Sequence, residues 1–145
     1  MSFSVGYNES MRTIEEILKG SRTVAVVGVS PREDRPSHGV ARYLKQQGYR
    51  IIPVNPQAAE VLGEKSYPSL SAVPVPVDVV DIFRRAEDVP PIVDEAVQMR
   101  AKVIWMQEGI VHEEAAARAR KAGLDVVMDR CMLKEHKRII GKGKA

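Results

Sequence analysis

The sequence predicts a doubly wound α/β domain, in which helices cover both faces of a five-stranded parallel sheet. Short runs rich in β-branched residues alternate with segments whose apolar residues recur at helical spacing. The connections between them are short, which favours parallel strands joined by right-handed crossovers. We expect the strand order 3-2-1-4-5 and one domain over residues 1–145, with its core at about 21–136.

The first half of the chain supplies two helices and two strands. A capped opening helix is indicated by the apolar residues Met11, Ile14, Ile17 and Leu18, with Asn8 or Ser10 as the cap and Gly20 at the end. Residues 23–29 form a nearly continuous β-branched run, as expected of a central strand covered on both faces. A crossover helix over 38–47 and a strand over 49–54, ended by Pro53 and Pro56, follow.

The second half repeats the alternation. We expect a third strand over 77–83, a helix with Pro90 and Pro91 in its first turn, a fourth strand over 103–106, a helix from about 113 to 122 and a fifth strand over 125–128.

Composition excludes several classes of protein. The chain is 44% hydrophobic and 28% charged, as in soluble globular proteins, and it lacks an apolar run of roughly 18 residues or an N-terminal leader. We therefore expect a cytoplasmic protein without membrane contact. The single cysteine, Cys131, and the absence of a Cys/His cluster exclude disulfide frameworks and zinc modules. A net charge of +3 with 5% aromatic residues argues against nucleic acid and suits a small phosphorylated ligand.

The end of the first strand has the features of an anion site. Gly28 lets the backbone approach a phosphate, and the N-terminus of the following helix favours negative charge. Ser30 and Ser37 add hydroxyl donors, and Arg32 and Arg35 lie in the connecting loop. The alternative is structural: a tight strand-to-helix turn, a helix cap and solvated arginines.

A standard dinucleotide fingerprint is not met, since Ser30 and Glu33 occupy its second and third glycine positions. After the second strand, Asn55 and Pro56 stand where an acidic residue would bind the ribose of NAD. A neutral side chain there tolerates a ribose phosphate, which favours a nucleotide other than NAD. A simple Asn-Pro turn explains the pair equally well.

Two further strand ends offer binding groups. Phe83, Arg84 and Arg85 follow the third strand, and an aromatic ring beside two fixed cations suits a base and a phosphate. Gly109, after the fourth strand, offers backbone amides, although an ordinary loop glycine is the simpler interpretation.

Catalytic groups are few. We expect structural or solvent-exposed roles for the histidines, with His136 solvated in a charged stretch, and a small buried hydrophobe at Cys131. The sequence shows no acid/base pair, metal set or nucleophile motif, so we predict no catalytic residue and no metal site.

Taken in order, the motifs resemble a known family. They are VAVVGVS (24–30), RPSHGVARYL (35–44), GYRIIPVNP (48–56), LGEKSYPSL (62–70), VDVVDIFRR (77–85), WMQEGI (105–110) and VVMDRC (126–131). Over roughly residues 21–136 the chain is similar to the small CoA-binding-domain family, Rossmann-like proteins that resemble the N-terminal domain of the succinyl-CoA synthetase alpha subunit.

The resemblance implies a site for coenzyme A. It matches Gly28, Val29 and Ser30 to the phosphate loop, Arg35 and Ser37 to the start of the crossover helix, Asn55 and Pro56 to the adenosine turn, and Phe83 and Arg84 to the lip of the third strand. The synthetase subunit has a further domain with a phosphorylated histidine, for which this chain has no room, so we do not carry over ligase activity.

We therefore expect a small stand-alone CoA or acyl-CoA binding protein without catalytic activity of its own. The alternatives are a CoA-dependent ligase or transferase-like subunit completed by a partner chain, and an NAD(P)-binding regulator. Exposed helix faces allow a homo-oligomer, although nothing in the sequence selects one.

Overall fold

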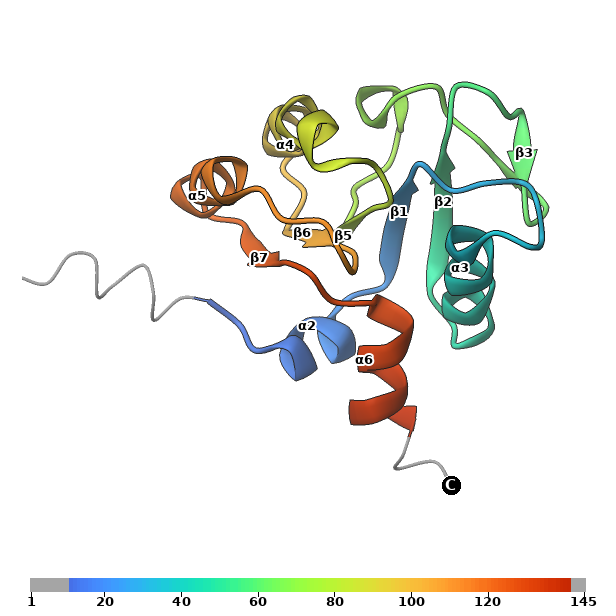
Figure 1. Ribbon diagram of the computed structural model, residues 1–145, viewed down its shortest axis with the longest axis horizontal. Helices are drawn as coiled ribbons and strands as arrows, with labels where there is room; N and C mark the ends of the chain where they lie inside the picture. The colour runs from blue at the N-terminus through green and yellow to red at the C-terminus, as the bar shows by residue number, and fades with distance from the viewer. Residues whose placement is uncertain (1–10, 142–145) are drawn as a thin grey trace, which may run out of the picture.

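The computed structural model describes residues 11–141, and a five-stranded parallel sheet forms its centre (Figure 1). The strands of this sheet are β1 (Thr23–Val27), β2 (Arg50–Val54), β5 (Val79–Ile82), β6 (Val103–Met106) and β7 (Asp125–Val127). Every neighbouring pair is parallel. The predicted α/β class and the five parallel strands are confirmed.

The strands lie in the order β2-β1-β5-β6-β7. Outside β2, Tyr67 makes one parallel bridge with Val54. If this bridge is counted as the third strand, the sheet has the predicted 3-2-1-4-5 order with β7 added at the far edge. The segment 77–83, which we expected to be the third strand and to lie beside the second, lies beside β1 instead. The chain first forms the Tyr67 bridge outside β2 and then crosses to the opposite side of β1. The winding therefore reverses between β1 and β5.

Helices cover both faces of the sheet (Figure 1). One face carries α4 (Val89–Gln98) and α5 (Glu113–Lys121), and the other carries α2 (Ile14–Gly20), α3 (Pro36–Gln46) and α6 (Met132–Ile139). Successive strand residues alternate between the two cores: Ala25 and Val27 face α4 and α5, whereas Val24 and Val26 face the other layer. Within residues 11–141, no helix is both long and apolar enough to cross a membrane.

The bounds of the predicted elements differ from the observed ones for local reasons. The first strand ends at Val27 rather than at residue 29, because Gly28 has a φ of 88° and leaves the strand conformation. The first helix begins at Ile14, and Thr13 and Glu16 form a capping box with bonds of 3.1 and 2.8 Å. The predicted caps, Asn8 and Ser10, lie outside the described residues.

Several elements have no counterpart in the prediction. The short ones are the hairpin of β3 (Glu60–Val61) and β4 (Glu64–Lys65) and the 3-10 turns η1 (Leu70–Ala72) and η2 (Ala86–Asp88). Lys45 of α3 holds the hairpin: its ammonium donates to the Leu62 carbonyl at 2.6 Å and lies 3.1 Å from Glu64. The larger omission is α6, which provides one wall of the cavity described below.

The expectation that His136 is solvated is wrong. His136 is 3% exposed, and its Nδ1 lies at hydrogen-bond distance, 2.7 Å, from the hydroxyl of Tyr43. Its ring also makes edge contacts with Tyr43 and Tyr49. Met132 and Glu135 are buried on the same side of the helix. The charged stretch therefore hides an amphipathic helix, in which residues three and four apart share the face toward the sheet.

Candidate ligand-binding site

The carboxyl ends of β2, β1 and β5 meet at Gly28. Its N–H donates to the Val54 carbonyl at 2.9 Å, and the N–H of Phe83 donates to the Val27 carbonyl at 2.8 Å. A Cβ at Gly28 would lie 2.7 Å from the Phe83 carbonyl oxygen. Only glycine combines the positive φ with this close approach, so the residue expected at a phosphate loop is required by the packing of two strands.

The loop from residue 28 to residue 37 is braced by its own hydroxyls. Ser30 N–H donates to Ser37 Oγ at 2.9 Å, and Arg32 N–H donates to Ser30 Oγ at 3.1 Å. The helix α3 then begins with Pro36, and its first turn carries no acidic residue. An exposed Arg35 precedes it and has no ion pair among residues 11–141. The start of α3 is thus open to an anion.

The side chain of Asn55 connects this loop to the turn after β2. Its Nδ2 donates to the Val29 carbonyl at 2.8 Å, and its Oδ1 accepts from the Gln57 N–H at 2.7 Å. Its backbone N–H donates to the Tyr67 carbonyl at 2.9 Å. Asn55 therefore positions the loop, with one amide hydrogen and one lone pair left over.

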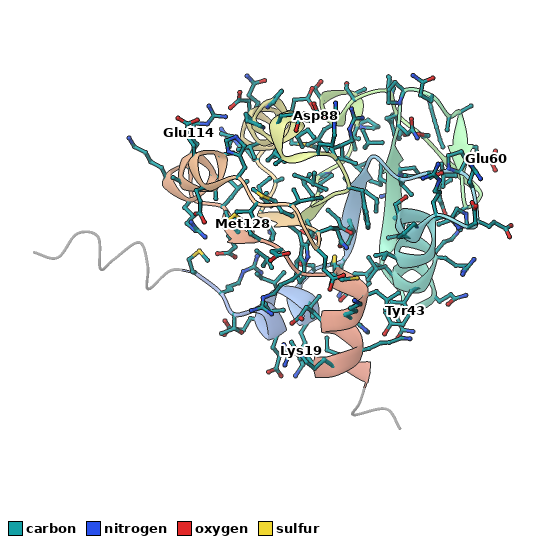
Figure 2. All side chains as sticks on the ribbon, in the orientation of Figure 1. Lys19, Tyr43, Glu60, Asp88, Glu114 and Met128 are labelled. Atoms are coloured by element: carbon teal, nitrogen blue, oxygen red, sulfur yellow. The ribbon has the colours of Figure 1, made fainter. Side chains whose placement is uncertain are left out.

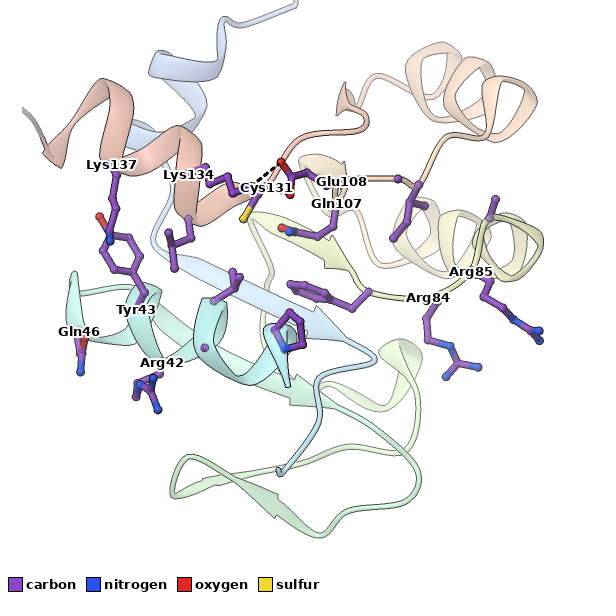
Figure 3. A pocket seen from close by; sticks show the side chains of 18 residues that line it. Arg42, Tyr43, Gln46, Arg84, Arg85, Gln107, Glu108, Cys131, Lys134 and Lys137 are labelled. Atoms are coloured by element: carbon purple, nitrogen blue, oxygen red, sulfur yellow. Dashed lines mark hydrogen bonds and ion pairs between the residues drawn. The ribbon is translucent and has the colours of Figure 1, made fainter. Parts of the chain in front are cut away.

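A cavity of about 1060 Å³ lies between α3 and α6, above the ends of β5 and β6 (Figure 3). Its lining is strongly basic: five cationic side chains surround it, against a single carboxylate, Glu108. The cations are Arg42, Arg84, Arg85, Lys134 and Lys137. Val40, Phe83, Ile110 and Leu133 contribute apolar surface. Such a lining suits an anionic ligand that also has an apolar part.

The lysines of this cavity are held by neighbouring groups. Lys134 donates to both oxygens of Glu108 at 3.1 Å, and this bond and the charge of Glu108 raise the pKa of Lys134. Lys137 lies 5.4 Å from the ring centre of Tyr43. Burial raises the pKa of the Tyr43 hydroxyl. Lys134 thus stays charged at neutral pH.

The arginines remain available to a ligand. Arg84 and Arg85 lie 3.6 and 3.8 Å from Asp88, and because all three side chains are partly exposed these pairs contribute little. Arg42 has no carboxylate partner within the described part of the chain. Figure 3 shows Arg42 and Arg85 at the rim, directed outward.

A second, smaller cavity of about 280 Å³ adjoins the first. Pro56 and Arg84 line it, together with Val27, Val54 and residues of η1 and α4. Arg84 lines both cavities, so a ligand that extends from the turn at residues 55–56 to the α3–α6 cavity would pass this side chain.

The structure distributes the ten predicted site residues around this edge of the sheet. Three of them, Phe83, Arg84 and Gly109, line the large cavity. The N–H of Gly109 is bound by Asp129 Oδ1 at 2.7 Å, so it is engaged within the protein. The other seven lie at the ends of β1 and β2 and at the start of α3: Gly28, Val29, Ser30, Arg35, Ser37, Asn55 and Pro56. Their roles toward a ligand stay predictions.

The sequence interpretation missed the helical wall of the cavity. Tyr43 of α3 and Lys134 and Lys137 of α6 line it, and the three-residue spacing of the two lysines was the only local signal. His112, in contrast, caps α5 through a bond of 3.1 Å from the Ala115 N–H. Across residues 11–141, no group of three or more His, Cys, Asp or Glu side chains is arranged to hold a metal.

The fold and the cation-lined cavity at the carboxyl edge define a doubly wound, Rossmann-like α/β protein. A family model described as CoA binding domain matches residues 22–137, and the chain belongs to this family. The predicted resemblance to the CoA-binding-domain family is therefore confirmed.

Individual relatives agree with this assignment. An uncharacterized protein of Bacillus subtilis, YneT, is 43% identical over 129 residues, which are 89% of this chain and 96% of that protein. A solved structure of a hypothetical protein from Pyrococcus horikoshii is 39% identical, with a TM-score of 0.86 over 91% of this chain and 95% of that one.

An enzyme relative covers a shorter region. ADP-forming acetate–CoA ligase II of Archaeoglobus fulgidus is 37% identical over 83 residues, which are 56% of this chain and 12% of the enzyme. This relative is named an acetate–CoA ligase, and the similarity to the succinyl-CoA synthetase alpha subunit remains a prediction.

Proposed function

We propose that this chain is a CoA or acyl-CoA binding protein with no catalytic activity of its own. The observation that carries the proposal is the large cavity between α3 and α6, which places five cations and one carboxylate beside apolar side chains. CoA combines three phosphate groups with a long, largely uncharged pantetheine arm, so its two ends need these two kinds of surface.

The parts of CoA have counterparts along the sheet edge. The pyrophosphate suits the start of α3, where the helix dipole favours negative charge and the first turn carries no acidic residue. The ribose phosphate suits Arg84, which can form paired hydrogen bonds to phosphate oxygens. Residue 55 is a neutral asparagine rather than a carboxylate, so it does not repel this phosphate. The pantetheine arm suits the apolar lining formed by Val40, Phe83 and Leu133.

The polar groups of the cavity support binding rather than catalysis. Its carboxylate, Glu108, accepts from Lys134, and the hydroxyl of Tyr43 is engaged with His136. Neither is held against a nucleophile in the way an acid/base pair requires. A protein with this arrangement would sequester or sense CoA.

Ligand titrations test the proposal directly. Calorimetry and thermal melts with CoA, acetyl-CoA, dephospho-CoA, NAD, NADP and ATP should show binding of CoA and acetyl-CoA, with dephospho-CoA weaker. A ligand at 100 times its Kd should add about 2.7 kcal/mol of stability. Absence of a shift at millimolar CoA, or tighter binding of NAD than of CoA, would overturn the proposal. Turnover of acetyl-CoA by the purified chain would overturn its non-catalytic part.

A further inference from the structure

We propose that Cys131 forms a mixed disulfide with CoA by exchange with a CoA disulfide, and that Gln107 and Cys131 together form the inner end of the cavity. The inference rests on the proposed CoA binding and adds a modification site to it. It starts from two neighbouring groups that the binding of phosphates does not use.

Cys131 is the N-cap residue of α6, and hydrogen bonds of its two sequence neighbours connect it to β6 and the residue that follows β6. On one side, Trp105 Nε1–H donates to the carbonyl of Arg130 at 2.8 Å. On the other side, the N–H of Met132 donates to Gln107 Oε1 at 3.1 Å. These two long-range bonds flank the cysteine directly. Cys131 is 8% exposed and lines the cavity, and Figure 3 shows its sulfur directed into the space between α3 and α6.

Gln107 supplies an independent sign that a ligand reaches this point. Its side chain lines the cavity although the residue is only 5% exposed. The bond from Met132 fixes its amide, and its Nε2 donates to no acceptor among the residues that the structure describes. Because Gln107 lines the cavity, an oxygen atom of a ligand held there would give this donor an acceptor.

The order of groups along the cavity matches one orientation of CoA. The arginines and Lys137 lie away from Cys131, whereas the inner wall offers a neutral amide donor and a thiol beside the Lys134–Glu108 pair (Figure 3). A neutral donor suits the amide carbonyls of the pantetheine arm, and phosphates suit the cationic rim. In this orientation the sulfur end of the arm faces the sulfur of Cys131.

The exchange needs no external oxidant. The Cys131 thiol loses its proton, and its thiolate attacks one sulfur of the CoA disulfide. The Cys131–CoA S–S bond forms as the CoA–CoA S–S bond breaks, and the departing CoA thiolate takes up a proton. Lys134 lies one helical turn from Cys131. The pKa of Lys134 is raised chiefly by its hydrogen bond to Glu108 and slightly by the charge of Cys131. A cation therefore lies within electrostatic reach of the attacking sulfur.

Intact-mass spectrometry tests this inference cleanly because the chain contains one cysteine. Wild-type protein incubated with CoA disulfide should gain the mass of one CoA less two hydrogens, and dithiothreitol should remove it. Cys131→Ser should show no gain. Glutathione disulfide, which lacks the nucleotide, should react at least tenfold more slowly, and excess acetyl-CoA should suppress the reaction with CoA disulfide.

The outcomes separate the two proposals. If calorimetry shows CoA binding to the reduced protein but CoA disulfide leaves no adduct, the exchange is overturned and the CoA site stands. Equal rates with glutathione disulfide, or no suppression by acetyl-CoA, would show an accessible thiol that the cavity does not direct, which also overturns the inference. Absence of CoA binding would overturn the proposed function itself.

Discussion

Arg84 packs directly against Gly28: a Cβ on Gly28 would lie 2.7 Å from Cδ of Arg84. The two residues are 56 positions apart, and they meet because β5 pairs with β1 in parallel register. The stem of Arg84 is thereby placed over the turn that follows β1, and the residue lines both cavities. Gly28 and Arg84 are therefore one structural unit.

Gly28→Ala should destabilise the protein and weaken CoA binding. The left-handed backbone costs about 1–2 kcal/mol for a residue with a side chain, and the new Cβ would also clash with the Phe83 carbonyl oxygen, a backbone atom that cannot rotate away. Thermal melts and calorimetry measure both effects. Gly48→Ala is the matched control, because Gly48 has a φ of 101° but no atom within 4 Å of the added Cβ. Equal losses in the two variants would contradict the close packing at Gly28.

Arg84→Gln should raise the Kd for CoA about tenfold, which corresponds to about 1.4 kcal/mol, because a charged partner of the phosphate is lost while the stem remains. The salt dependence of binding should also decrease. Arg118→Gln removes the same charge from α5, on the opposite face of the sheet, where Arg118 pairs with Asp94 at 3.2 Å. Its Kd should stay at the wild-type value, and a similar loss there would assign the effect to net charge.

Asn55→Ala should lower the stability of the ligand-free protein by about 1–3 kcal/mol, since one hydrogen bond from the turn after β2 to the loop after β1 and one within that turn disappear. Chemical denaturation measures the change. Gln57→Ala keeps the backbone N–H that Asn55 accepts from and should behave as wild type. If Asn55→Ala unfolds at the wild-type denaturant concentration, its role as a positioning residue is refuted.

Asp81→Asn should stabilise the protein at neutral pH but not in acid. Asp81 is completely buried in β5, neither of its carboxyl oxygens has a hydrogen-bond partner among the described residues, and burial raises its pKa well above 3.8. The folded state therefore retains a proton that the unfolded state loses as pH rises through about 4, so wild-type stability falls by about 1.4 kcal/mol per pH unit until the folded pKa is reached.

The measurement for Asp81 is the difference in unfolding free energy between the two proteins at several pH values. The difference should grow in favour of the variant above about pH 4 and vanish below it. Asp94→Asn, at an exposed position on α4, should give no such trend. A difference that does not change with pH would show that Asp81 is charged in the folded protein.

Local sequence patterns were sufficient to predict most of the helices and strands. The β-branched run at 23–27 and the apolar strand at 103–106 need burial on both faces, and Pro90 and Pro91 are tolerated only in the first turn of a helix. The C-terminal helix was missed because its charged residues dominate a linear reading, whereas its apolar face becomes evident only when it packs on the sheet.

By itself, the sequence determined the α/β class, the alternation of strands and helices, and Gly28 as the turn residue after the central strand, because periodicity and backbone preference act over a few residues. Only the tertiary structure decided that β5 lies beside β1, that Arg84 meets Gly28, and that α3 and α6 enclose a cationic cavity with Gln107 and Cys131 at its inner end. Those relationships depend on which distant segments pack together, and packing is set by the shape and burial of the whole core rather than by any one segment.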